Sequence, residues 1–284
     1  MSQQPFVPLL LGADINVYSM ARAFHEAYGV KSIVFGMFAA SVCAGSKIID
    51  YRIRQGNDTV EQVLELEPEH LSCYGLKVEE GTPLFAMKDT AGLPGDEEQA
   101  DMYLQTVEFL KQYGYEQYEI SNFAKPGFQS RHNLKYWMGR PYIGFGPGAH
   151  SDFGGRRYSF VRDLDKYISG VLGGGVVIDE SELIPQRERG SEYLMLRLRT
   201  TRGIEEWEYR REFFMNFDPI EQKLEEYERQ GWTERHDRRW NLTPKGFLVS
   251  NQLIGELLAI QEEATLEKTL PRLKQGRPES EQER

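Results

Sequence analysis

The sequence predicts an α/β fold with a helical carboxy-terminal part, and three observations support this. Apolar runs of strand length alternate with helix-like segments through the first half of the chain. Glycine or proline stands where several of these helix-like segments end. From residue 185 onward the apolar spacing is helical, and one short hairpin interrupts it. The 284 residues suffice for one large domain or two ordinary ones, so length does not choose between them.

Composition and charge narrow the class of protein. With 40% hydrophobic and 27% charged residues the chain is typical of globular proteins. A net charge of -10 counts against general nucleic-acid binding, which depends on clustered cations. The longest apolar runs, residues 6–11 and 33–42, are too short to cross a bilayer, and the amino terminus lacks the basic region of a secretory signal. We therefore expect a cytoplasmic protein without a membrane span, in which Cys43 and Cys73 stay reduced.

The first part of the chain predicts a β-α-β unit. Residues 6–11 have the pattern of a buried strand, residues 17–28 have helical spacing, and residues 31–38 form a second apolar run. Gly29 is placed to end the helix. A helix that joins two strands in this way makes them a parallel pair, which is how doubly wound sheets begin.

This same part resembles the amino terminus of ATP-grasp carboxylate–amine ligases, over about fifty residues. The resemblance is carried by LLGADINVYSMARAFHEAYGVKSIVFG and by GSKIIDYRI. It makes Gly12 and Asp14 candidates for a phosphate-binding loop. The simpler alternative is that these two residues form a turn and the N-cap of the helix.

Four more elements are predicted in the order helix, strand, helix, strand: residues 59–66, 71–78, 97–113 and 115–123. Pro68 stops the first helix and Gly114 is placed to cap the second. This alternation favours a parallel α/β barrel or sheet.

The carboxy-terminal part is predicted to be mostly helical. Helices are expected over residues 191–199, 219–230 and 245–258, and a hairpin joins residues 232–235 to 240–242. Thr243 and Pro244 supply an N-cap and a first-turn proline for the last helix. Helices followed by a hairpin resemble a winged helix. The mixed charge, glycine and proline after Glu263 predict a disordered tail.

The most informative stretch is residues 115–163, which contains EISNFA, RHNLKYW and GFGPGAHS in that order. It resembles the signature region of the heme-chaperone branch of the oxygen-independent coproporphyrinogen oxidase-like radical-SAM proteins. HLSCYGLKVEEGTP, residues 70–83, resembles the strand and loop that precede this region. The resemblance continues into the helical end and covers roughly 200 of the 284 residues.

The resemblance implies both an organisation and a function. Residues 1–54 would be the ligase-like segment, 55–180 the second half of a radical-SAM, TIM-like barrel, 181–262 the winged-helix-like domain, and 263–284 the tail. The implied function is heme handling or porphyrin metabolism. Its partners would be heme or a porphyrin and proteins that accept heme.

A candidate heme site lies within six residues of the signature region. It combines an imidazole that can bind metal, an amide and two flat rings: His132, Asn133, Tyr136 and Trp137. Iron takes a histidine nitrogen and a porphyrin needs flat apolar cover, so His132 is the candidate metal ligand. The alternative is that His132 and Asn133 bond to loop backbone while the two rings pack in the core.

Two further groups are candidates for cofactor contact. One group lies where the predicted strand gives way to a loop: Glu119, Ser121 and Asn122. In α/β barrels the carboxyl ends of the strands form the functional site. The other is the glycine loop, which the resemblance places near S-adenosylmethionine: Gly144, Gly146 and Gly148. A tight turn explains these glycines as well. His150 is either a second ligand or an ordinary hydrogen-bonded histidine.

The chain departs from the family pattern in its cysteines. Catalytic members hold a [4Fe–4S] cluster with a C-x-x-x-C-x-x-C loop, whereas this chain has Cys43 and Cys73, thirty residues apart. We therefore expect a truncated or chimeric product without radical catalysis, in which heme binding survives. Half a barrel would leave strand edges and apolar surface uncovered, which favours self-association.

Two other functions remain as alternatives. A fragment of an ATP-grasp ligase would rest on residues 1–54, without the later nucleotide and metal segments. A winged-helix nucleic-acid-binding module would rest on three hairpin arginines: Arg235, Arg238 and Arg239. Glu234 and Asp237 interrupt these arginines, and the acidic chain opposes that function.

Overall fold

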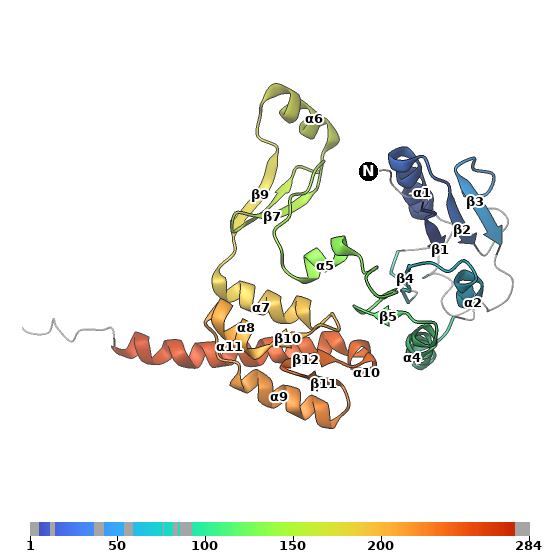
Figure 1. The fold of residues 1–284 in the computed structure, drawn as a ribbon. Coiled ribbons are helices and arrows are strands. Elements are labelled where there is room, and N and C mark those ends of the chain that lie inside the picture. Colours follow the sequence, from blue (N-terminus) through green and yellow to red (C-terminus); the bar gives the residue numbers. More distant parts are fainter. Residues whose placement is uncertain are drawn as a thin grey trace, which may run out of the picture. The chain divides into compact units, whose positions relative to one another are not determined.

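The computed structural model divides the chain into two compact units, Met1–Glu69 and His70–Arg284 (Figure 1). It describes the following residues: 6–11, 15–36, 43–53, 59–75, 77–81, 85 and 93–275. The predicted phosphate-loop residues Gly12 and Asp14 lie outside them. The boundary between the units falls later than the predicted boundary between residues 54 and 55.

The first unit is built on a parallel sheet, as the β-α-β pattern predicts. Its strands are β1 (Leu9–Leu11), β2 (Ser32–Gly36) and β3 (Ile49–Ile53), in that spatial order. Helix α1 (Ile15–Tyr28) joins β1 to β2. Gly29 follows the helix in the left-handed conformation that a C′ glycine adopts. A small apolar core forms beneath the sheet: Leu10, Ala21, Val34, Cys43 and Ile49. Helix α2 (Thr59–Leu64) follows.

The second unit begins with a short antiparallel sheet, so the predicted parallel arrangement is wrong for these strands. Strand β6 (Asn122–Ala124) lies between β4 (His70–Ser72) and β5 (Glu116–Gln117), antiparallel to both. The predicted strand over residues 115–123 turns back on itself between β5 and β6. Parallel neighbours need a crossover of a dozen or more residues, and this connection is a tight turn. Helix α4 (Asp96–Gln112) precedes β5.

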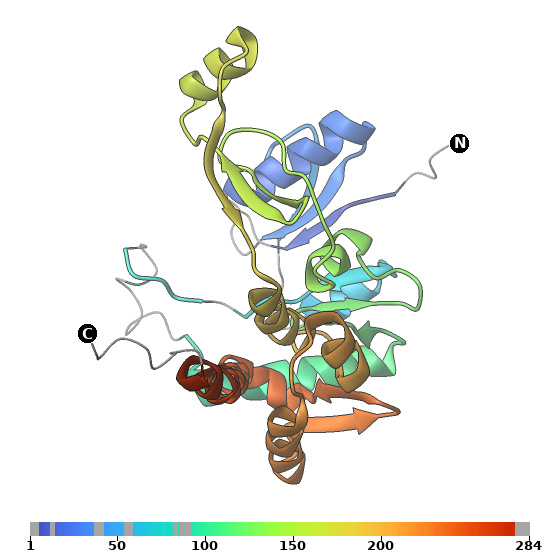
Figure 2. The same cartoon turned by 90° about the vertical axis from the view of Figure 1, so that its left-hand side faces the viewer.

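A second antiparallel sheet follows, which the sequence analysis did not anticipate. It contains β7 (His150–Phe153), β8 (Arg156–Phe160) and β9 (Ile178–Leu183), in that order. Gly154 and Gly155, both at positive φ, form the two-residue turn between β7 and β8. Helix α6 (Leu164–Gly173) connects β8 to β9 and lies at the end of this sheet that is farther from α7 (Figures 1 and 2).

The helical end packs around the largest core of the chain. Its helices are α7 (Gln186–Arg197), α8 (Glu206–Phe213), α9 (Asp218–Arg229), α10 (Pro244–Leu248) and α11 (Ser250–Gln275). Strand β12 (Arg239–Leu242) pairs antiparallel with β10 (Ile204–Glu205) and β11 (Thr233–His236). The described part of the chain contains no helix with the length and apolar character that crossing a membrane requires.

Most local expectations for this end are confirmed. Ile220, Leu224 and Tyr227 of α9 are buried, and the predicted hairpin is β11–β12. The Thr243 hydroxyl accepts a hydrogen bond from the Gly246 amide at 3.1 Å, as an N-cap should. The predicted helix over 245–258 is divided, because Val249 leaves the helical conformation between α10 and α11. Helix α11 also extends past Glu263 to Gln275, into the segment predicted to be disordered.

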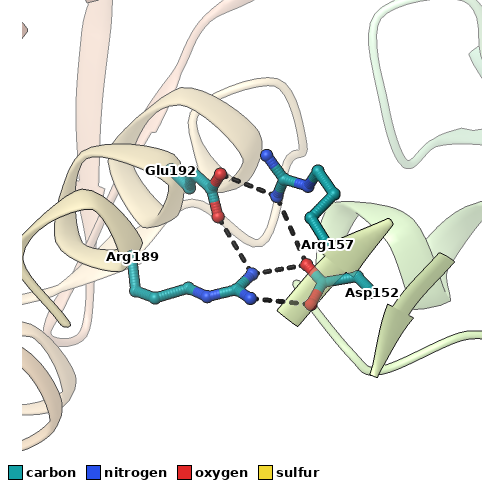
Figure 3. Close-up of polar contacts among 4 residues, drawn as sticks. All are labelled: Asp152, Arg157, Arg189 and Glu192. Atoms are coloured by element: carbon teal, nitrogen blue, oxygen red, sulfur yellow. Dashed lines mark hydrogen bonds and ion pairs between the residues drawn. The ribbon is translucent and has the colours of Figure 1, made fainter. Parts of the chain in front are cut away.

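Four charged side chains join the second sheet to α7 (Figure 3). Arg189 on α7 donates hydrogen bonds to both carboxylate oxygens of Asp152 on β7, with Nη2 2.6 Å from Oδ1. Arg157 on β8 donates to Glu192 on α7 at 2.7 Å and to Asp152 at 3.2 Å. Arg189 also contacts Glu192 at 3.1 Å. The charges alternate in sign around this ring, hereafter the β7–α7 charge network. The Asp152 side chain is only 15% exposed. The hydrogen bond from Arg189 holds the pKa of Asp152 below its ordinary value.

We expect the substitution Asp152→Asn to lower the free energy of unfolding of the second unit by about 1–3 kcal/mol at neutral pH, because two partly buried arginines lose their carboxylate. All four tryptophans lie in this unit, so their fluorescence during denaturant unfolding is the measurement. Glu226→Gln, which removes an exposed pair with Lys223, is the control and should change stability by less than about 0.5 kcal/mol.

The pH dependence of this effect has a definite sign. The pKa of Asp152 is lowered in the folded state, so its contribution is complete above the ordinary value of 3.8 and is lost as the pH falls through the lower folded value. The difference between wild type and Asp152→Asn should be the same at pH 7 and at about pH 5.5, and should shrink below pH 4. A difference that persists unchanged in acid would contradict the assignment.

Candidate functional site

The candidate heme residues lie on α5 (Arg131–Trp137), which follows β6. The Ser130 hydroxyl caps the helix by accepting a hydrogen bond from the Asn133 amide at 3.3 Å. Gly139 stands at positive φ just beyond the end of the helix. The sequence therefore fixes a helix of two turns here, with a polar cap at one end and a glycine beyond the other.

One face of α5 carries His132 and Tyr136, four residues apart. Their rings meet edge to face with centroids 4.9 Å apart, and the Tyr136 ring meets Tyr142 in the same way at 4.7 Å. His132 is exposed and Tyr136 is 38% exposed. Within the described residues no hydrogen bond to the His132 ring is present, so both ring nitrogens are accessible. The three side chains, hereafter the α5 aromatic face, do not pack as core, which excludes that alternative for Tyr136.

Backbone pairing holds Tyr142 to the β7–α7 charge network. The Tyr142 amide donates to the Asp152 carbonyl at 2.8 Å, and the Asp152 amide donates back to Tyr142 at 2.9 Å. The same Asp152 binds Arg189 and Arg157 through its side chain. The network therefore fixes the position of one ring of the aromatic face.

Asn133 and Trp137 of α5 are partly buried, unlike the exposed His132. Trp137 lines a cavity of about 380 Å³ that α7 also lines, with Arg189, Glu192 and Tyr193. The side chain is partly buried. Residues five apart on a helix are turned by about 140°, so Trp137 borders this cavity while His132 is exposed. The grouping of all four residues as one heme site stays a prediction.

The predicted cofactor residues after β5 are occupied by contacts within the chain. Glu119 and Asn122 are 3% and 2% exposed. The Glu119 carboxylate accepts hydrogen bonds from the Asn122 side-chain amide and from the Ser121 amide, and Ser72 donates to Asn122. Burial raises the pKa of Glu119 above its ordinary value. The groups point inward, and their role in cofactor contact stays a prediction.

The glycine loop also bonds to its own chain. The Gly144 amide donates to the Ser151 hydroxyl at 3.0 Å, and the Gly148 amide donates to the Val161 carbonyl at 3.1 Å. A Cβ atom at Gly144 would lie 2.3 Å from the His150 carbonyl oxygen. Gly146 and Gly148 have positive φ. These contacts give the glycines a structural reason, and contact with S-adenosylmethionine stays a prediction. His150 is exposed on β7.

Comparison with known proteins places this geometry in a family. The family model for the HemN C-terminal domain matches residues 184–249. A protein named "Heme chaperone HemW" from Bacillus subtilis is 32% identical over 203 residues, which are 70% of this chain and 54% of that protein. The chain belongs to the HemN/HemW-like radical-SAM family. The Escherichia coli protein of the same name is 31% identical over 211 residues, 74% of this chain and 55% of the relative.

A solved structure of coproporphyrinogen III oxidase (HemN) from Escherichia coli, described as a radical SAM enzyme, shows the fold of the family. It superposes with a TM-score of 0.58 over 88% of this chain and 63% of that chain, at 15% identity. The chain spans about half the length of the curated HemW relatives it matches.

The cysteines of this chain do not fit the [4Fe–4S] cluster that radical-SAM proteins use. The cluster needs three cysteine thiolates, and the sequence has two cysteines. Cys43 is buried in the core of the first unit. Cys73 belongs to the second unit, and burial raises the pKa of its thiol to about 11, so the thiol is protonated at neutral pH.

The sequence predicts the α5 histidine as a ligand but does not predict the residues that support it. Tyr142 and the four members of the β7–α7 charge network have no signature in the sequence. Asp152 and Arg157 are five residues apart, but their partners follow more than thirty residues later.

We expect Gly144→Ala to destabilise the second unit by about 1–3 kcal/mol, because the added methyl group would collide with the His150 carbonyl. The measurement is tryptophan fluorescence during denaturant unfolding. Gly173→Ala, at a glycine whose Cβ would meet nothing within 4 Å, is the control and should be neutral or slightly stabilising. Equal stability of both variants would show that the loop is not tightly packed.

Proposed function

We propose that this chain binds heme on the α5 aromatic face, with His132 as the axial ligand of the iron. The observation that carries the proposal is the exposed, unbonded imidazole of His132 held edge to face against Tyr136. The curated relatives in bacteria are named heme chaperones, which supports heme as the ligand.

The geometry suits an iron porphyrin in two respects. A neutral imidazole with a free ring nitrogen is a common axial ligand of heme iron. Tyr136 and Tyr142 provide flat, amphipathic surface beside it, over which the macrocycle can lie. The edge-to-face contact restrains the imidazole plane, so the ligand is oriented before heme arrives.

We further propose that the chain handles heme without radical catalysis. Reductive cleavage of S-adenosylmethionine needs an iron–sulfur cluster, and two cysteines in different compact units cannot supply its three thiolates. Binding heme and passing it to an acceptor protein needs no such cluster. The helical end, including the HemN C-terminal domain match, is the part we take to be winged-helix-like.

The nucleic-acid alternative is not favoured by the contacts of the hairpin arginines. Arg239 bonds to Glu205 at 2.6 Å and to Glu208 at 2.6 Å. Arg235 pairs with Glu221 at 3.2 Å. Two of the three cations on which that alternative rests are thus neutralised within the chain. The ligase alternative rests on residues 1–54, and its candidate phosphate-loop residues Gly12 and Asp14 lie outside the described residues.

We expect hemin to bind with a shifted Soret band, and His132→Ala to weaken binding by about tenfold or more because the iron loses its axial nitrogen. Titration of hemin at the Soret wavelength is the measurement. His236→Ala is the matched control, since His236 is an exposed histidine on β11. Cys43→Ala and Cys73→Ala should also leave the band unchanged. An equal shift for wild type and His132→Ala would remove His132 as the ligand.

We expect anaerobic reconstitution with iron and sulfide to give no stoichiometric [4Fe–4S] cluster, because the chain lacks a third thiolate. Iron and sulfide content and the visible absorption of the product are the measurements. Four irons for each chain, with the broad absorption of such a cluster, would contradict the absence of radical catalysis.

A further inference from the structure

A second face of α5 borders a cavity of about 440 Å³ with an unusual concentration of positive charge. Arg131 and Lys135 of α5 line it, together with Arg140 and Arg202. Its volume is within the range of small-molecule pockets in proteins. None of the side chains that line it is acidic.

Three of these four cations have no carboxylate partner among the described residues, and the fourth has a distant one. Among the described residues, Arg131, Lys135 and Arg140 form no ion pair. Arg202 lies 3.7 Å from Glu208, a carboxylate that Arg239 and the Tyr193 hydroxyl already contact more closely. Four cations around one cavity repel each other unless an anion joins them. In a chain with a net charge of -10, this cavity is a local site for an anionic group.

The remaining lining is apolar or uncharged. Leu134 and Met138 contribute apolar surface. The Tyr118 hydroxyl is bonded to a ring nitrogen of His70 at 2.7 Å, and burial raises the pKa of Tyr118 to about 12, so the phenol stays neutral. Cations around an apolar wall fit a ligand that carries carboxylates on an apolar body.

Helix geometry places this cavity beside the proposed iron ligand. Successive residues of a helix are turned by about 100°, so Arg131 and Lys135 share one face and His132 stands on the adjoining one. All three lie within little more than one turn, about 6 Å along the axis. The Arg140 amide donates to the Lys135 carbonyl at 3.0 Å, which brings Arg140 back to the same cavity.

We propose that this cavity receives the propionate carboxylates of the porphyrin, while the macrocycle lies over the α5 aromatic face. The choice of ligand rests on the proposed function, and the cation cluster is an observation of its own. Guanidinium groups bind carboxylates in bidentate geometry, which fixes direction as well as distance. The cavity therefore sets the rotation of the porphyrin about the axis through its iron.

The test uses metal-free protoporphyrin IX, whose binding does not involve an axial ligand, and follows its fluorescence. The triple variant Arg131→Gln, Lys135→Gln, Arg140→Gln should raise the dissociation constant by about tenfold, because charge-assisted hydrogen bonds to the propionates are lost. Lys166→Gln is the matched control: it removes an exposed cation on α6, outside this cavity. It should leave the affinity unchanged.

The dimethyl ester of protoporphyrin IX provides the chemical control, because its propionates carry no charge. It should bind wild type and the triple variant alike. In wild type, raising the salt concentration should weaken binding of the free acid and not of the ester. These measurements on wild type need no variant, and far-UV circular dichroism verifies that the triple variant is folded.

The outcomes separate this inference from the proposed function. The propionate site would be overturned if the triple variant bound the metal-free porphyrin as tightly as Lys166→Gln does. It would also be overturned if the triple variant lost as much affinity for the dimethyl ester as for the free acid. The hemin titration of His132→Ala tests the iron ligand independently. Suppose the triple variant no longer binds the metal-free porphyrin, while His132→Ala leaves the Soret band unchanged. The propionate site would then stand, and His132 would not be the iron ligand.

Discussion

The paired arginines and carboxylates between β7, β8 and α7 are the interaction on which the candidate site depends. Asp152 uses its side chain to bind two arginines and its backbone to hold Tyr142. Tyr142 contacts Tyr136, and Tyr136 contacts His132. A continuous series of contacts therefore runs from the charge network on α7 to the exposed imidazole on α5. Because a partly buried charge left without its partner is costly, this arrangement has a strong energetic reason to persist.

The polar residues around the turn between β5 and β6 also help to hold α5 in position. Glu119 pairs with Thr200 in an isolated β-bridge, and the Thr201 amide donates to the Tyr118 carbonyl at 3.2 Å. These bonds tie the turn to the loop after α7. Helix α5 thus stands between two attachments to the same helical domain. A binding site is more precise when rigid elements support it from below, and this explains why buried polar residues precede α5.

The family match and the side chains from which the function is proposed lie in different parts of the molecule. The HemN C-terminal domain match covers residues 184–249, in the helical end. The exposed histidine and the cation-lined cavity lie on α5, before that match begins. The domain match supports the fold, and the side chains of α5 supply the chemistry from which the function is proposed. Helix α5 contacts α7 of the helical end, and the two helices line one cavity together.

The sequence by itself determined the features that depend on neighbouring residues. These include the Thr243 N-cap, the inward face of α9, the β11–β12 hairpin, the β-α-β start and the motif that contains His132. Each follows from backbone preferences or helical spacing over a few residues. Only the tertiary structure decided that β6 pairs antiparallel with β4 and β5, and that Trp137 borders α7 while His132 is exposed. It also decided that Asp152 meets Arg189. Partners this distant along the chain are chosen by packing and by the cost of burying charge, which no local pattern records.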